Sequence, residues 1–280
     1  MIKNILVALD GSEYSQCATT HALELAKAHG ATVTGMGIVD MEGIERDSIY
    51  VPLGGSYYKK QLDEVREAKA REHVESLLDV FESTCAKEGV DVARLMKVGT
   101  PIKRIYLDSL FSDIIILGLR TYFIFGSGKE GGSTLRDLVR ETIRPVLAVP
   151  KTYRPVKQIL LATDFSPACS RLSYFMSHVP MFKDAEINAI SLVKDDDDIV
   201  HGKELATQGQ EFLRSHGLKV GSFKVKKGDP DDGILSYALE SGADLIALGI
   251  HSKRTLHDRI FGSTLEVLLE KSGVPLLMYQ

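Results

Sequence analysis

The chain has 280 residues, 44% of them hydrophobic and 26% charged, with a formal net charge of −4 at pH 7. This composition is typical of a globular protein, and no apolar run approaches the roughly 20 residues that span a bilayer. The net charge gives no electrostatic reason to expect nucleic acid or a membrane surface as a partner. An odd set of widely spaced cysteines (Cys17, Cys85 and Cys169) and the lack of a signal-peptide pattern predict a cytoplasmic protein.

In the first half, apolar runs rich in β-branched residues alternate with amphipathic stretches. This alternation is typical of βαβ units whose strands are covered on both faces. Strands are predicted over residues 2–9, 32–39, 91–97, 113–118 and 146–149. The second and third of these strands lie far apart in the sequence. We therefore predict an insertion at about residues 41–65, with a loop over 41–58 followed by a helix over 59–87.

The second half repeats this order after a short linker. Residues 151–155 end in a proline and interrupt both periodicities, which predicts a boundary between a domain at 1–150 and a domain at 156–280. Strands are predicted over residues 158–163, 186–193, 219–226, 244–249 and 276–279.

Segments of the two halves match one another in the same order. The matched pairs are 5–12 with 159–166, 98–101 with 227–230, 112–118 with 243–249, and 132–135 with 262–265. An ordered series of this kind indicates a duplication. The predicted fold is α/β, with two tandem, doubly wound, Rossmann-like domains, each a five-stranded parallel sheet of strand order 3-2-1-4-5.

The last strand of each half would leave an open sheet edge. We expect residues 146–149 to pair with residues 276–279, because this pairing covers both edges and makes an intramolecular pseudo-dimer. Association of two whole chains as a homodimer remains an open alternative.

A ligand site is predicted where the strand order reverses, at the carboxyl ends of the strands. Asp10 and Gly118 lie there in the first half, and Asp164 and Gly249 lie there in the second. A helix is predicted to start near each Gly-Ser-Thr sequence that follows. Free backbone N–H groups at such a start favour an anion. The segments are Gly132, Ser133 and Thr134 in the first half and Gly262, Ser263 and Thr264 in the second.

Both halves resemble domains of the universal stress protein family. Nucleotide-binding members of that family carry a glycine, two residues, a second glycine, nine residues, and then glycine with serine or threonine. The second half keeps this spacing from Gly249 to Gly262, with Ser252 in place of the second glycine and His251 matching a common histidine. The first half has Thr121 instead of the second glycine and one extra residue in the spacing.

The resemblance implies an adenine nucleotide, ATP or AMP, as ligand. It places Asp10 and Asp164 near the ribose and phosphates, the backbone of Val39 and Val193 near adenine, and the phosphates in the glycine loops. It also implies a non-catalytic sensor or regulator in the stress response, acting through a protein partner that the sequence does not identify. Mg²⁺ could accompany the nucleotide, held in part by the acidic run 195–198, for which a solvated acidic turn is the plainer interpretation.

Two further functions stay open at this point. Ser263 with Glu266, and Thr134 with Asp137, have the spacing of helix caps, so both motifs could serve the fold alone. The protein would then be a scaffold or a carrier of another small ligand, with aromatic residues (Tyr57, Phe123 and Phe125) lining the crevice. A slow ATPase is the third possibility.

Overall fold

The computed structural model describes residues 2–46, 56–121, 131–250 and 261–280. The first half contains strands β1 (Asn4–Leu9), β2 (Thr32–Val39), β3 (Val92–Val98), β4 (Ile114–Gly118) and β5 (Val146–Val149). Its helices are α1 (Glu13–His29), α2 (Met41–Arg46), α3 (Ser56–Lys87), α4 (Pro101–Ser109) and α5 (Gly131–Glu141).

The second half contains strands β6 (Gln158–Ala162), β7 (Glu186–Val193), β8 (Lys219–Lys227), β9 (Leu245–Gly249) and β10 (Leu276–Tyr279). Its helices are α6 (Pro167–Ser177), α7 (Asp196–Ser215), α8 (Pro230–Glu240) and α9 (Phe261–Lys271), with a short 3-10 turn at Pro180–Phe182.

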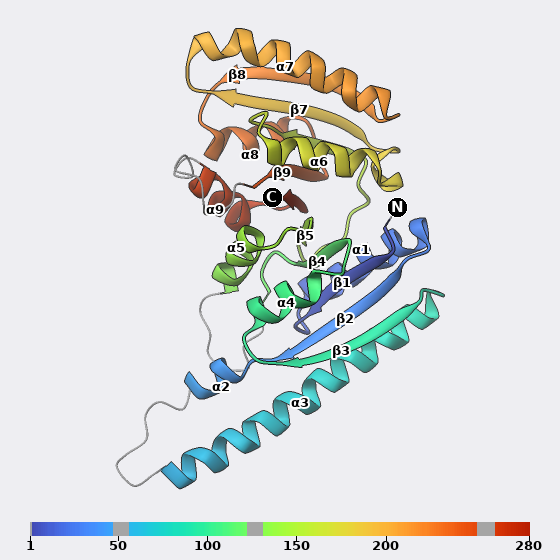
Figure 1. Cartoon of the computed structure of the whole chain (residues 1–280), viewed down its shortest axis with the longest axis vertical. Helices are drawn as coiled ribbons and strands as arrows, with labels where there is room; N and C mark the ends of the chain where they lie inside the picture. The colour runs from blue at the N-terminus through green and yellow to red at the C-terminus, as the bar shows by residue number, and fades with distance from the viewer. Residues whose placement is uncertain (1, 47–55, 122–130, 251–260) are drawn as a thin grey trace.

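The described strands form one continuous ten-stranded sheet in the order β3-β2-β1-β4-β5-β10-β9-β6-β7-β8 (Figure 1). Strands within each half pair in parallel, and each half has the predicted order 3-2-1-4-5. The α/β fold class is therefore confirmed. All ten strands lie within two residues of their predicted bounds.

The alternation of side chains along each strand gives the sheet two apolar faces. Ile5 and Val7 of β1 join the core formed with α1, α3 and α6, whereas Leu6 and Ala8 join the core formed with α4, α5, α8 and α9. Because helices cover both faces, the inner strands β1, β4, β5, β6 and β9 are almost wholly apolar, whereas the outermost strands β3 and β8 also carry charged residues such as Arg94 and Lys224. This explains why the apolar runs were strong predictors of strands.

The two halves meet at an antiparallel seam, as predicted. In the β5–β10 pairing Leu277 lies opposite Leu147, and both side chains are buried. On one face an ion pair joins Arg136 of α5 to Glu266 of α9 at 2.9 Å. The seam thus contains both the main-chain pairing of a sheet and side-chain contacts between its covering helices.

The segment after β2 differs from the predicted loop. Residues 41–46 form α2, and α3 begins at Ser56, so the prediction of a loop over 41–58 is wrong at both ends. The Asp40 carboxylate accepts the N–H of Gly43 at 3.1 Å and starts α2 as an N-cap. Thr100 at the start of α4 donates a hydrogen bond to Glu42, which holds this short helix in place.

The linker crosses a buried histidine of α1. His21 is 2% exposed, and neither of its ring nitrogens has a hydrogen-bond partner among the described residues. The ring of Tyr153 covers it at a centroid distance of 4.9 Å, and the Tyr153 hydroxyl donates to Glu24 one turn further along α1. Burial lowers the pKa of His21 to about 4, so the ring is neutral at pH 7.

Within the part of the chain that the structure describes, no helix combines the length and apolarity needed to cross a bilayer. Residues 2–46, 56–121, 131–250 and 261–280 also contain no group of three or more histidine, cysteine or acidic side chains placed to hold a metal ion.

Candidate functional site

The predicted aspartates are fixed in tight turns at the ends of β1 and β6. Asp10 Oδ1 accepts hydrogen bonds from the Ser12 N–H at 3.0 Å and from the Ser12 hydroxyl at 2.6 Å. Ser12 in turn caps α1 by accepting the N–H of Ser15 at 3.2 Å. Aspartate favours such a turn because its side chain bonds the backbone two residues on.

The second half repeats this turn with one chemical difference. Asp164 Oδ1 accepts the Ser166 N–H at 2.9 Å, and it also accepts the Cys169 thiol at 3.2 Å. Burial, and then the nearby Asp164 charge, raises the pKa of Cys169 to about 11. The thiol therefore stays protonated and acts as a hydrogen-bond donor to the aspartate, where the first half has Ser15 at the matching position.

The glycines that end β4 and β9 allow the strand to touch the following layer. A Cβ added at Gly118 would lie 2.4 Å from Cβ of Tyr14, in the first turn of α1. A Cβ added at Gly249 would lie 2.6 Å from the backbone N of Cys169 in α6. Both distances are shorter than any real carbon contact, so a side chain at either position would push the strand end away from the helix start.

We expect Gly249→Ala to lower the free energy of unfolding by about 1 to 3 kcal/mol, because the obstructing atoms include backbone that cannot rotate aside. Gly273→Ala is the matched control, since an added Cβ meets nothing within 4 Å there. Its effect should stay within about 0.5 kcal/mol. Urea unfolding of both variants measures the difference, and equal stability of the two would contradict the packing role given to Gly249.

The backbone groups expected near adenine already take part in the sheet. The Val39 carbonyl accepts the Gly99 N–H, and the Val193 carbonyl accepts the Gly228 N–H, each at 3.0 Å. A carbonyl oxygen has two lone pairs, so each can still accept one further bond. Contact with an adenine ring stays a prediction for both positions.

The structure places the Gly-Ser-Thr segments inside helices. Helix α5 begins at Gly131 and α9 at Phe261, so Gly132, Ser133 and Thr134 lie in the first turn of α5, and Gly262, Ser263 and Thr264 lie in the first turn of α9. The backbone N–H groups of a first helical turn lack partners within the helix. Since α9 begins before Ser263, that residue is not the N-cap that a capping box with Glu266 would require.

Asp231 is the residue that the sequence analysis missed. It lies in the first turn of α8, and its Oδ1 accepts hydrogen bonds from the hydroxyls of Thr264 and, at 3.2 Å, Ser263. The local sequence Asp-Pro-Asp-Asp at 229–232 was visible as a helix start. Its proximity to α9 was not, because the two segments are more than 30 residues apart and only the packing of α8 on α9 brings them together.

Several predicted residues cannot be placed. His251 and Ser252 lie outside the described residues, as do Phe123 and Phe125. Thr121 is described: its side chain is 2% exposed, and its hydroxyl donates to the Gly118 carbonyl at 2.7 Å. Tyr57 is 67% exposed on α3.

The acidic run at 195–198 forms a helix start rather than the predicted turn. Asp195 is the N-cap residue of α7, and the other three aspartates lie in its first turn, where carboxylates are favoured by the helix dipole. Asp196 pairs with Lys227 at the end of β8 at 3.0 Å.

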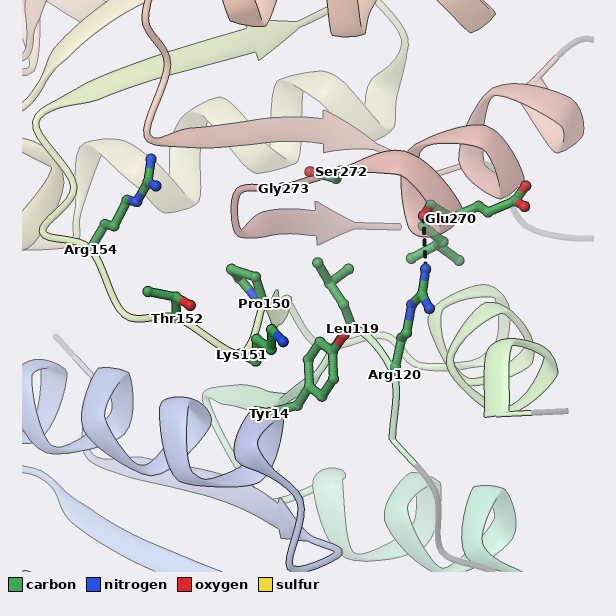
Figure 2. Close-up of a pocket in the computed structure, with 11 residues that line it drawn as sticks. Tyr14, Leu119, Arg120, Pro150, Lys151, Thr152, Arg154, Glu270, Ser272 and Gly273 are labelled. Carbon is green, nitrogen blue, oxygen red and sulfur yellow. Dashed lines mark hydrogen bonds between the residues drawn. The ribbon is translucent and has the colours of Figure 1, made fainter. Parts of the chain in front are cut away.

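A cavity of about 270 Å³ lies between the halves, beside the carboxyl end of β4 (Figure 2). Tyr14, Arg120 and Lys151 line it from the first half and the linker, and the end of α9 closes the opposite side. Arg120 donates to the Glu270 carbonyl at 3.4 Å. On the other half, Gln280 donates to the Arg140 carbonyl of α5 at 2.8 Å, so each half holds the helix end of the other.

Comparison with known proteins agrees with this architecture. Residues 1–150 and 178–280 match the sequence model of the Universal stress protein family. The chain is 24% identical to "Universal stress protein Slr1230" of Synechocystis sp., with 100% of both chains covered.

Two solved structures share the fold. One is a universal stress protein from Archaeoglobus fulgidus, with a TM-score of 0.69 and 20% identity over 99% of this chain and 96% of that one. The other is a putative universal stress protein from Pseudomonas aeruginosa, with a TM-score of 0.66 and 17% identity over 99% of this chain and 93% of that one.

Proposed function

Because this chain belongs to the universal stress protein family, we propose that it binds an adenine nucleotide, ATP or AMP, in at least one of its halves. The nucleotide would lie at the carboxyl ends of β1 and β4, or of β6 and β9. A protein partner in the stress response would bind differently to the nucleotide-bound and nucleotide-free forms of the chain.

The observation that carries this proposal is the shared geometry of the two strand ends. Asp10 and Asp164 are fixed by turns, and the glycines at the ends of β4 and β9 touch the first turn of the neighbouring helix. In each half the next helix along the chain starts with Gly-Ser-Thr in its first turn. Backbone N–H groups and the positive end of the helix dipole favour phosphate there.

Saturation with nucleotide should stabilise the folded chain. At about 100 times its dissociation constant a ligand adds roughly 2.7 kcal/mol to the free energy of unfolding. We expect a rise in melting temperature with ATP or AMP, measured with and without Mg²⁺, and a smaller rise or none with GTP. Absence of a shift with ATP, ADP and AMP alike would favour the scaffold or carrier function instead.

We further propose that the protein is not an ATPase of physiological rate. The aspartates nearest the site accept hydrogen bonds that start helices, a structural role distinct from that of a general base beside a bound water. Phosphate release from ATP in the presence of the protein should match the rate without protein. A clearly higher rate would show that the protein is an ATPase rather than a non-catalytic sensor.

A further inference from the structure

The start of α9 already has a carboxylate beside it. Asp231 Oδ1 accepts the hydroxyls of Ser263 and Thr264, both in the first turn of α9, and Thr264 is 1% exposed. Asp231 is itself held in position, because its N–H donates to the Asp229 carboxylate at 2.9 Å. The contact is therefore part of the packing of α8 on α9.

The Asp231 carboxylate takes up two hydroxyl donors of the first turn of α9 and places a negative charge there. Negative charge near the first turn of a helix is stabilised by the dipole, and ionised oxygens accept stronger hydrogen bonds than neutral ones. A phosphate brought to the same turn would meet a like charge within a few ångströms. Repulsion between two like charges at such distances lowers the binding constant by several-fold to more than tenfold.

The first half differs at the matching position. Alignment of Gly99-Thr100-Pro101 with Gly228-Asp229-Pro230 places Ile102 opposite Asp231, and Lys103 opposite Asp232. The first turn of α4 thus carries no carboxylate, whereas the first turn of α8 carries two, Asp231 and Asp232. The position that carries the carboxylate of Asp231 in the second half is therefore occupied by an uncharged side chain, Ile102, in the first half.

We propose that Asp231 acts as a built-in occupant of the phosphate position in the second half, so that wild-type chain binds nucleotide in the first half alone. This inference rests on the proposed function, since it assigns that function to one of two duplicated sites. The glycine spacing alone would favour the second half as the binding site, because the family spacing is better kept from Gly249 to Gly262 than in the first half. The inference favours the first half instead.

Titration calorimetry with ATP tests the inference on the full chain. Wild-type protein should bind one equivalent. Asp231→Ile, which installs the residue of the first half, should bind a second equivalent or bind at the second half at least tenfold more tightly. Asp232→Asn is the matched control, because it removes the charge of the adjacent residue, which is exposed on the same helical turn, and it should leave the stoichiometry at one.

A purely structural role for Asp231 predicts a different pair of results. Loss of its two hydrogen bonds would lower the melting temperature of Asp231→Ile without any gain in binding. The inference predicts the lower melting temperature in the absence of ligand together with a larger shift on adding ATP. A lower melting temperature without ligand, combined with a larger rise on adding ATP, therefore distinguishes an internal occupant from a simple helix contact.

Each outcome decides between the two proposals. Two equivalents in wild type would refute the role of Asp231 and leave nucleotide binding intact. One equivalent in wild type and one in Asp231→Ile would also refute it alone. No binding in wild type but one equivalent in Asp231→Ile would support the role of Asp231 and refute binding at the first half, and with it nucleotide binding by the native chain. No binding by either protein would overturn both.

Discussion

Lowering the pH from 7.5 to 4.5 is expected to reduce the free energy of unfolding by roughly 2 to 3 kcal/mol through His21 alone. Burial lowers the pKa of His21 from its ordinary 6.5 to about 4, so the folded protein keeps the ring neutral while the unfolded chain takes up a proton below pH 6.5. The stabilisation is complete above pH 6.5 and is lost as the pH falls toward 4. Acid therefore favours unfolding at this position.

Urea unfolding of wild type and His21→Leu at both pH values isolates this effect from other titrating groups. The variant should lose less stability on acidification than wild type, by the same 2 to 3 kcal/mol. At pH 7.5 it should be no less stable, since it removes two buried nitrogens that have no hydrogen-bond partner in the described part of the chain. His201→Gln, at an exposed position of α7, is the control and should follow wild type. Parallel pH curves for wild type and His21→Leu would show that His21 is not buried in the neutral form.

Leu277→Ala is expected to cost about 2 to 5 kcal/mol of stability, because it opens a cavity at the seam between the halves. Leu277 has no exposed surface and lies opposite Leu147 on the face covered by α1 and α6. Since the core on this face runs across the seam and contains residues of both halves, both halves should lose stability in the same unfolding transition. Hydrogen exchange of β1 and β6 amides, read alongside urea unfolding, measures this.

Leu239→Ala makes the same chemical change at a position that is 84% exposed in α8. It should alter the free energy of unfolding by no more than about 0.5 kcal/mol. If Leu277→Ala destabilised β6 to β10 and left exchange in β1 to β5 unchanged, the halves would be independent folding units joined by a linker.

The inner strands were predictable because buried parallel strands are apolar at nearly every position. The outermost strands β3 and β8 carry charged residues and were found because the second half repeats the order of the first. The β5–β10 seam followed from the need to cover two sheet edges. Helix α2 was missed because six residues are too few to show a helical period, and Asp40, its N-cap, also reads as the end of a strand. Local sequence therefore sufficed for the long elements and failed for the short one.

The placement of the candidate residues at the strand ends was predictable from the sequence, whereas their contacts were not. Asp10, Asp164, Gly118 and Gly249 lie at the strand ends where they were expected, but their observed contacts are turns and close packing. Asp231 could not be found from its own neighbourhood. Its carboxylate accepts hydrogen bonds from α9, which is distant in sequence. Such contacts follow from the packing of α8 on α9 rather than from any local pattern.

The antiparallel seam inside a single polypeptide has an evolutionary consequence. A dimer of identical subunits must carry every substitution twice, so a substitution that abolishes ligand binding in one subunit abolishes it in both. Joining the copies end to end removes this coupling. Position 102 can then keep an isoleucine while its counterpart at position 231 is an aspartate. Selection can preserve ligand binding in one copy and, in the other, only the residues that complete the shared sheet.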